Sequence, residues 1–291
     1  MRPLGAQLRA EITMLFTNGE TLFLTLGIPV VFLLFFSAVH VLPTGTTHPV
    51  DFLVPGILAL AVMSTSMTAL SIGTGFERGY GVLKRLGSTP LGRPRLLAAK
   101  IIAVLLVEVL QAAVLVGVGY LMGWNPGGPG GAAALVGQAV VAMVLGTVAF
   151  GGVGLILAGT LKPLVNLAVV NALFVVLLLL GGMLIPLSRL PHWLAQLSRL
   201  LPPAALSEAL HGALGHGVPV AARDWVVLAV WAAGAPVVAA LTFRWEYPAV
   251  GGWPGPPGRV SARPRARGSR CRVRPWSPGR SGGGRPDPTR R

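Results

Sequence analysis

Long uncharged stretches, separated by short polar segments, dominate the first 247 residues of the chain. Each stretch reaches or exceeds the roughly 17–25 residues that are needed to cross the hydrocarbon core of a bilayer. The stretches lack the alternation of barrel strands, and a backbone in lipid is satisfied only within helices or closed barrels. The pattern therefore predicts membrane-spanning helices. The uncharged runs cover residues 21–40, 52–76, 109–161, 163–188 and 225–243.

The longest of these runs must hold more than one helix. Residues 125–131 are NPGGPGG, and Pro with clustered Gly ends a helix and favours a turn. Residues 101–107, which precede Glu108, extend the helix before this turn. We therefore predict an all-α integral membrane protein with six transmembrane helices, in a domain that covers residues 21–247. The six helices are expected near residues 21–42, 52–75, 97–123, 132–160, 163–186 and 224–243.

Three further segments lie outside these spans. In residues 1–20 the apolar side chains recur on one helical face, which predicts an N-terminal amphipathic helix at the membrane interface. Residues 190–214 repeat the pattern around Pro202 and Pro203 but are too short and too polar to cross, so we expect a helical hairpin on the outer face. Residues 248–291 are rich in Arg, Pro and Gly, which predicts a disordered tail.

Composition and charge support a membrane protein and give its orientation. Mean hydropathy is +0.70 and 11% of residues are charged, whereas about a quarter are charged in a soluble domain. Lys and Arg in short loops stay on the cytoplasmic side. With six spans, 21 of the 24 Lys and Arg residues fall on the side of the two termini, and Arg189, Arg199 and Arg223 fall on the other. We predict that both termini are cytoplasmic.

The tail accounts for most of the net charge of +15, because residues 244–291 hold twelve Arg and two acidic residues. Such a tail can attract anionic lipid head groups or nucleic acid, or it can be a solvated extension without a partner. We favour the solvated extension and expect no nucleic-acid partner.

Motifs for catalysis and for cofactor binding are absent from the sequence. It has no G-x-x-x-x-G-K-[ST] phosphate loop and no pair of histidines at metal-binding spacing. The single cysteine, Cys271, excludes an internal disulfide and a cysteine-built metal site. We expect that this chain has no catalytic residue and binds no metal or cofactor.

Glu108 is the one acidic residue inside a predicted span. A charge at mid-helix costs roughly 2.5–3.5 kcal/mol on insertion scales, so this side chain should face protein or a water-filled cavity, or carry a proton. Gln111 lies one turn further on the same face, and the two can form a polar patch. The patch either contacts substrate or protons, or makes an interhelical hydrogen bond. A similar stripe on the second helix, more typical of packing than of a pathway, comprises Ser64, Thr68 and Ser71.

A strongly basic segment, residues 77–100, separates the second and third spans. Within it the sequence VLKRL at residues 82–86 can form a short amphipathic helix, Pro90 ends this helix, and Arg93 leads into the third span. We expect an ordered protrusion, although a solvated loop that only anchors the topology would carry the same charge.

This segment resembles the signature of the ABC-2 type permeases, the membrane subunits of ATP-binding cassette exporters. Members carry a pattern like E-x-x-x-G-T-L-E-R-L-x-x-T-P-x-x-R, followed by a Lys that opens the third helix. The chain departs from it at Val82, where Thr is common, and at Lys84, where Glu is usual. The matching residues are Glu77, Gly81, Leu83, Arg85, Leu86, Thr89, Pro90, Arg93 and Lys100.

The predicted outer hairpin resembles that of the same family. Many members carry Arg where this chain has His211. The resemblance covers about residues 1–247, and drug-export permeases of the daunorubicin-resistance type look most similar. The residues that carry the likeness in the hairpin are Pro186, Leu190, Pro191, Trp193, Leu194, Pro202, Pro203, Glu208, Ala209 and Leu210.

The resemblance implies a division of labour between subunits. Separate ATPase subunits, expected as a dimer, would hold ATP and Mg²⁺, so this chain would be a transport subunit and not an enzyme. Two permeases, identical or different, would form the pathway in the cytoplasmic membrane of a bacterium. ATPase closure would be transmitted through a coupling helix within residues 77–90, which also includes Arg78 and Lys84. The implied substrate is a hydrophobic or amphiphilic small molecule, most typically a drug or antibiotic.

Other functional classes remain open. A secondary transporter driven by protonation of Glu108 would work without ATP, but the internal inverted repeats that are frequent in such carriers are not evident. Export of a lipid or a polysaccharide would use the same apolar surfaces as export of a drug. A membrane enzyme is disfavoured because nucleophiles, acids and metal ligands are not clustered, and a non-transporting assembly factor is compatible with the sequence.

Overall fold

The computed structural model describes residues 5, 9, 13, 17, 19–39, 49–83, 92–126, 131–184, 186–215 and 219–243. Within these residues the regular elements are all helical and no strand occurs. In chain order the elements are α2 (Gly19–Val39), α3 (Pro49–Met63), η1 (Ser64–Ala69), α4 (Leu70–Gly79), α6 (Arg93–Leu121), α7 (Gly131–Thr160), α8 (Pro163–Leu180), η2 (Leu187–Arg189), α9 (His192–Ser198), α10 (Pro202–Leu214) and α11 (Ala222–Thr242).

Five helices of the described part are long and apolar enough to cross a membrane. The first is a continuous helix, Pro49–Gly79, that α3, η1 and α4 form together. A shorter apolar helix, Thr25–Val39, lies within α2. The predicted all-α membrane class is confirmed, and the count of six spans stays a prediction. The other four long helices are Pro94–Leu121, Leu135–Thr160, Pro163–Leu180 and Ala222–Thr242.

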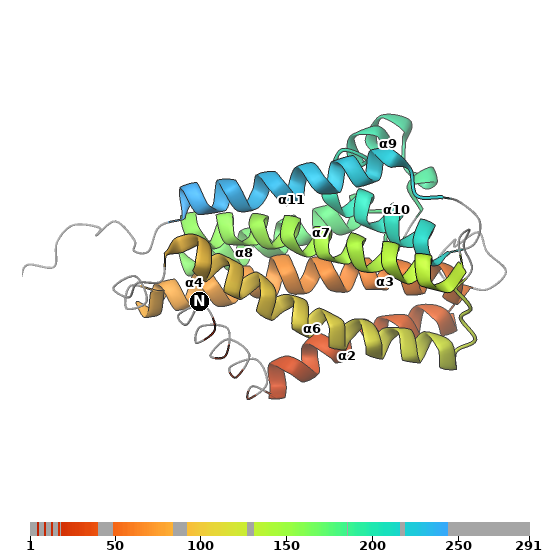
Figure 1. The fold of residues 1–291 in the computed structure, drawn as a ribbon, viewed down its shortest axis with the longest axis horizontal. Helices are drawn as coiled ribbons and strands as arrows, with labels where there is room; N and C mark the ends of the chain where they lie inside the picture. The colour runs from red at the N-terminus through yellow and green to blue at the C-terminus, as the bar shows by residue number, and fades with distance from the viewer. Residues whose placement is uncertain are drawn as a thin grey trace, which may run out of the picture. The chain divides into compact units, whose positions relative to one another are not determined.

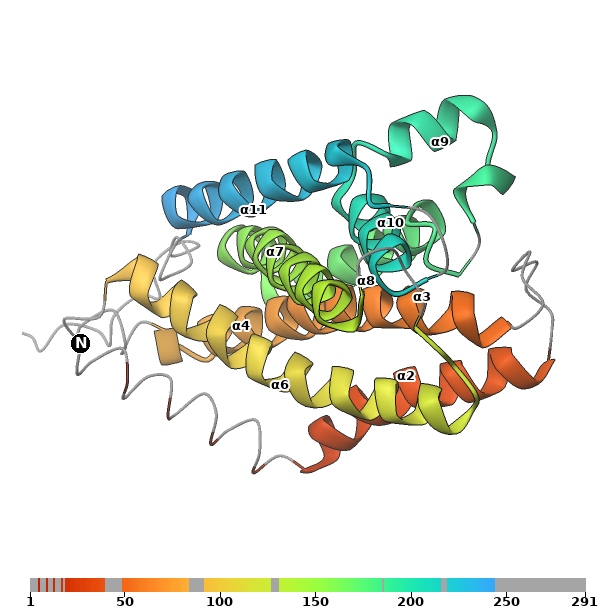
Figure 2. The ribbon, with the colours of Figure 1, turned by 45° about the vertical axis from the view of Figure 1, so that its right-hand side comes forward.

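α7 lies at the centre of the bundle. It contacts α3, η1, α4, α6, α8, α10 and α11, and Figures 1 and 2 both show it between α11 and the helix of α3 and α4. α2 packs against α3 and α6 on one side. In both views α9 and α10 lie towards one end of the bundle and the end of α4 lies at the other (Figures 1 and 2). The helix Pro49–Gly79 is the most enclosed, since 83% of its most apolar stretch is buried against 17% for α8.

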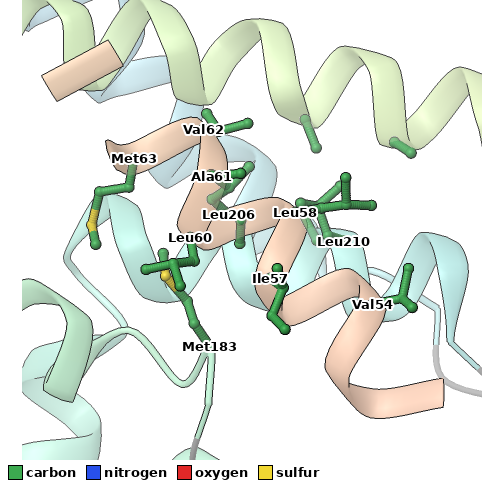
Figure 3. Packing of buried hydrophobic residues seen from close by; sticks show 14 of the residues in the cluster. Val54, Ile57, Leu58, Leu60, Ala61, Val62, Met63, Met183, Leu206 and Leu210 are labelled. Atoms are coloured by element: carbon green, nitrogen blue, oxygen red, sulfur yellow. The ribbon is translucent and has the colours of Figure 1, made fainter. Parts of the chain in front are cut away.

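The main hydrophobic core includes the buried side chains of α3 and α10, which pack against each other. Figure 3 shows Ile57 and Leu58 of α3 among Leu206 and Leu210 of α10, with Met183 alongside. Gly56 allows the backbone of Met183 to lie against α3, because a Cβ at this position would overlap the Met183 carbonyl oxygen. Within a bilayer such contacts stabilise the bundle through van der Waals packing, because the surrounding lipid is as apolar as these side chains.

Several predicted boundaries differ from the observed ones. The second helix was expected over residues 52–75 but runs from Pro49 to Gly79. The fifth helix was expected to reach residue 186 but ends at Leu180, because Gly181 and Gly182 follow and Gly182 has φ of 66°. A left-handed glycine of this kind ends a helix even when the next residues are apolar. The third helix begins at Arg93 and not near residue 97, with Pro94 in its first turn, where proline is favourable. The helix predicted over residues 1–20 lies largely outside the described residues, and the tail lies wholly outside them.

The second span contains a π-helical segment, η1, at its centre. A π-helix has more residues per turn than an α-helix, so side chains four apart no longer lie in line. The predicted stripe of Ser64, Thr68 and Ser71 assumed regular α-helical spacing, and η1 interrupts that spacing.

Candidate functional site

Glu77 and Lys100 form an ion pair between the two helix ends that flank residues 80–92. Glu77 lies in the last turns of α4 and Lys100 in the first turns of α6. Lys100 Nζ lies 2.9 Å from Glu77 Oε1 and 2.7 Å from Oε2. The Lys100 side chain is 2% exposed and that of Glu77 is 26% exposed. Separating the two helices would leave a buried ammonium group without this carboxylate, so the pair holds α4 and α6 together.

Arg78 connects the end of α4 to the end of α7. Its side chain is buried, and Nη1 donates to the carbonyl oxygens of Ala158 at 2.9 Å and Leu161 at 3.5 Å. The last carbonyl groups of a helix lack intrahelical donors and carry the negative end of the helix dipole, which favours a cation. Arg78 therefore caps α7.

The residues that follow α4 turn back into the bundle. Gly81 has φ of 74°, in the left-handed region that glycine adopts without a steric penalty. Leu83, two residues later, is fully buried in a cluster with Leu96 and Leu97 of α6, Leu155 of α7 and Phe243. Leu83 therefore anchors the start of residues 80–92 in the core.

α4 also packs closely on the start of α8. A Cβ on Gly75 would lie 2.7 Å from Asn166 Nδ2, and one on Gly79 would lie 2.7 Å from Pro163 Cγ. The Ser71 hydroxyl donates to Asn166 Oδ1 at 2.9 Å, and Asn166 Nδ2 donates to the Ser71 carbonyl at 2.9 Å. A displacement of α4 at this end is thus transmitted directly to α6, α7 and α8.

Four of the predicted coupling residues lie at or beside these contacts: Glu77, Arg78, Gly81 and Leu83. Arg93 begins α6, but its side chain is outside the described part of the chain. The short amphipathic helix expected over residues 82–86 stays a prediction. The remaining coupling residues, Lys84, Arg85, Leu86, Thr89 and Pro90, also lie outside the described residues.

Glu108 lies in the middle of α6 and is hydrogen-bonded to the Thr147 hydroxyl of α7. Glu108 is 2% exposed. The same hydroxyl donates to the Met143 carbonyl at 2.8 Å. A threonine hydroxyl carries one proton and cannot donate to both oxygens. A protonated Glu108 satisfies both contacts, because the acid donates to Thr147 while Thr147 donates to Met143. The neutral acid also avoids the cost of a charge within the membrane.

Gln111 makes separate contacts with two other helices. Its Nε2 donates to the Thr25 carbonyl of α2 at 2.8 Å, and its Oε1 accepts from the Thr65 hydroxyl of η1 at 3.2 Å. Glu108 and Gln111 therefore share a helix but bond to different neighbours, and the single polar patch expected from their spacing is two interhelical contacts.

The second-helix residues that were grouped with this patch do not act as one stripe. Ser71 bonds to Asn166 of α8, Ser64 is half-buried, and the Thr68 hydroxyl is buried with no hydrogen-bond partner among the described residues.

The segment between α8 and α11 contains the expected helical hairpin, formed by α9 and α10. Its place on the outer face stays a prediction. Pro191 precedes α9, and Pro202 and Pro203 begin α10, where the missing N–H groups cost nothing. Pro202 and Pro203 are buried, whereas Trp193 is 70% exposed. The indole of Trp231 in α11 donates to the Leu200 carbonyl at 3.1 Å, which fixes the turn between α9 and α10.

His211 connects α10 to the start of α3. Its Nε2 lies 3.0 Å from the Phe52 carbonyl, and its Nδ1 lies 2.7 Å from the Ser207 carbonyl and 3.3 Å from the Ser207 hydroxyl. Burial lowers the pKa of His211, although the two carbonyl groups oppose this. A neutral ring carries one N–H, so it donates either from Nε2 to the Phe52 carbonyl or from Nδ1 to the Ser207 carbonyl.

A comparison with protein families matches most of this chain. The model of the family described as ABC-2 type transporter matches residues 4–214, which is more than half of the chain. The match includes the contacts of Glu77 and Arg78 and ends with the last residue of α10. The chain belongs to the ABC-2 type transporter family. No match was found among curated proteins. This ABC-2 protein is accordingly a multi-pass membrane protein and the membrane component of a transporter.

Sequence reasoning missed most partners of the buried polar groups in the ABC-2 protein. Thr147 and Thr65 are small polar residues in uncharged spans, and the one available signal was their polarity. Thr25 binds Gln111 through its backbone carbonyl, which gives no sequence signal. The carbonyl groups that bind Arg78 give no sequence signal at all. Within the described ranges no three His, Cys, Asp or Glu side chains lie close enough to hold a metal ion.

Proposed function

We propose that this ABC-2 protein is the permease subunit of an exporter that separate ATPase subunits drive. The observation that supports this most is the pair of contacts at the end of α4, Glu77 with Lys100 and Arg78 with the last carbonyl groups of α7. They give residues 80–92 a rigid base, so a force applied there would displace α4, α6 and α7 together. The partner ATPases would form a dimer and hold ATP and Mg²⁺.

The proposed topology places both termini and residues 80–92 in the cytoplasm of a bacterium and the α9–α10 hairpin on the outer face of its plasma membrane. The distribution of Lys and Arg supports this. A second permease subunit, the same chain or a different one, would complete the pathway. The substrate would be a hydrophobic or amphiphilic small molecule such as a drug or antibiotic. The alternative is export of a lipid or a polysaccharide, which would use the same apolar surfaces of the protein as export of a drug.

A proton-coupled carrier that uses Glu108 is the second candidate function. Such a carrier must exchange the proton of Glu108 with solvent during each cycle. The Glu108 side chain is 2% exposed and its acid group is held by Thr147, which supports a structural contact and not a proton pathway. We therefore place Glu108 and Gln111 between the helices and not on the route of the substrate.

The experiment that tests the proposal reverses the charge of the coupling segment in the complete transporter. In Lys84→Glu/Arg85→Glu we expect ATP hydrolysis to continue while export falls at least tenfold, because the ATPase would no longer hold the segment. A tail variant, Arg263→Glu/Arg265→Glu, makes the same change of charge elsewhere and should export normally. Unchanged export by the Lys84/Arg85 variant would refute the coupling role.

A further inference from the structure

Asn171 is an exposed polar side chain near the middle of α8, the least enclosed of the five long helices. It is the ninth of the 18 residues of this helix, so it lies about 12 Å from the helix start. Among the described residues of the five long helices, no other exposed side chain with hydrogen-bonding groups lies more than a turn from a helix end. Asn171 therefore places an amide at the depth of the acyl chains.

The amide of Asn171 is only partly satisfied within its own chain. Its Nδ2 donates to the Leu167 carbonyl of the same helix at 2.7 Å. An amide has two N–H groups and an acceptor oxygen, so one N–H and Oδ1 have no partner among the described residues. Acyl chains offer neither donors nor acceptors, and an unpaired amide in lipid is unfavourable. By contrast Asn166, on the buried side of α8, pairs through both ends of its amide with Ser71.

The residues that share the exposed face of Asn171 follow the spacing of a helix–helix seam. Leu164, Ala168, Asn171 and Val175 are four, three and four residues apart, as in the a and d positions of a heptad. Leu164 is 73% exposed and Val175 is 52% exposed. Ala168 is exposed as well, and its short side chain allows another helix to approach closely. A single Asn in such a seam fixes the register and the number of helices.

A second copy of the chain matches both the depth and the chemistry of this face. Two copies insert in the membrane in the same orientation, so a two-fold axis along the membrane normal brings the same residues of each copy together. An amide is self-complementary, because the free N–H of one Asn171 can donate to Oδ1 of the other. Lipid supplies neither group, and a transported substrate would supply them only while it is bound.

We propose that α8 packs against α8 of a second copy of this chain, with the two Asn171 amides hydrogen-bonded to each other. The seam consists of Leu164, Ala168, Asn171 and Val175. This inference rests on the proposed function in one respect, because it identifies the second permease subunit as the same chain. The contact lies within the membrane and involves no ATPase, so its failure would leave the coupling role of residues 80–92 intact.

The first test compares two adjacent positions that are almost equally exposed. Val175 is 52% exposed and Val176 is 51% exposed, but they lie about 100° apart around the helix. Each is replaced by cysteine in a full chain that carries Cys271→Ser. After oxidation in membrane vesicles, Val175→Cys should form at least tenfold more disulfide-linked homodimer than Val176→Cys. Equal cross-linking, no cross-linking, or cross-linking of Val175→Cys to a different protein would overturn the proposal.

The second test measures the contribution of the amide to association. Full chains labelled at the native Cys271 are diluted in liposomes, and energy transfer between labels reports the dimer. Asn171→Leu keeps the bulk and removes the amide, so the mole fraction of protein at half-dissociation should rise at least threefold. Val176→Leu is the control for a change beside the seam and should stay within twofold of the wild type.

The outcome for Asn171→Leu also separates a second copy from a substrate as the partner of the amide. The one hydrogen bond of Asn171 lies within α8, so leucine should leave thermal unfolding of the chain almost unchanged. Unchanged association in Asn171→Leu would overturn the pairing of the amides. Loss of export without a change in association would assign the amide to the substrate and would overturn the proposal as well.

Discussion

Three polar side chains inside the apolar bundle bond to neighbouring helices. Glu108 reaches Thr147 of α7, Gln111 reaches α2 and η1, and Asn166 reaches Ser71 of α4. Hydrogen bonds of this kind average about 0.6 kcal/mol within membranes and seldom exceed about 1.7 kcal/mol. Their main effect is therefore to fix the register between helices, while packing supplies most of the stability.

Glu108 offers a direct test at this scale, because the protonated acid and a glutamine are both hydrogen-bond donors. We expect the free energy of unfolding of Glu108→Gln to lie within about 1 kcal/mol of the wild-type value. That of Glu108→Ala should be about 2–4 kcal/mol lower, because alanine loses the bond and leaves a cavity. Equilibrium unfolding in mixed micelles measures both. A glutamine variant as unstable as the alanine variant would contradict a neutral Glu108, and loss of export in the glutamine variant alone would favour the proton-coupled carrier.

The Glu77–Lys100 pair should respond asymmetrically to removal of either partner. Lys100 is 2% exposed and Glu77 26%, so Glu77→Gln leaves the more buried charge behind. We expect Glu77→Gln to lower the free energy of unfolding by about 3 kcal/mol and Lys100→Met to lower it by less. The double variant should be more stable than Glu77→Gln alone. A double-mutant cycle on unfolding free energies measures this, with the exposed Arg95→Met as the control. Additive losses in the cycle would show that the two side chains do not interact.

At the scale of helices, small residues determine how closely α4 approaches α8. A Cβ on Gly79 would lie 2.7 Å from Pro163 Cγ, whereas a Cβ on Gly73 of the same helix would have no atom within 4 Å. We expect Gly79→Ala to lower the free energy of unfolding by about 1–3 kcal/mol through overpacking, since the proline ring cannot move aside easily. Gly73→Ala should stabilise the isolated chain by up to about 1 kcal/mol, because alanine favours the helix. Thermal unfolding compares the two, and equal effects would rule out the close contact.

Helix positions were largely predictable because the bilayer imposes one simple requirement, an uncharged run of sufficient length. All five long spans overlap their predicted ranges. The end of α8 was predicted six residues late, since residues 181–186 carry no charge and the prediction did not use Gly181 and Gly182 as a stop signal. The π-helical segment η1 was not predictable, because its sequence STSMTA has no feature that distinguishes a π-helix from an α-helix.

Contacts between helices were less accessible to sequence reasoning. The residues of the Glu77 segment were recognisable by their resemblance to a family pattern, and Lys100 was part of that pattern. The contact of Arg78 with α7 joins residues 80 and 83 positions apart through backbone oxygens, which carry no sequence identity. The contact of His211 with the Phe52 carbonyl likewise joins residues 159 positions apart, and no local pattern specifies it.

At the scale of the whole molecule, the bundle has a different chemistry at each end. One end joins α4, α6, α7 and α8 through Glu77, Arg78 and their partners. The other end holds the α9–α10 hairpin and the contact of His211 with the start of α3. The helix Pro49–Gly79 connects the two ends and is enclosed along most of its length. A push at residues 80–92 would therefore be carried by this helix to the hairpin that packs on its start.

The most direct test of the central claim is affinity purification of the tagged full chain from its native membranes in mild detergent, followed by an assay of ATP hydrolysis. We predict that an ATPase with a phosphate loop co-purifies with the chain, and that Lys84→Glu/Arg85→Glu weakens this association at least tenfold while the tail variant Arg263→Glu/Arg265→Glu does not. A chain that purifies alone and transports in vesicles without ATP would contradict an ATPase-driven permease.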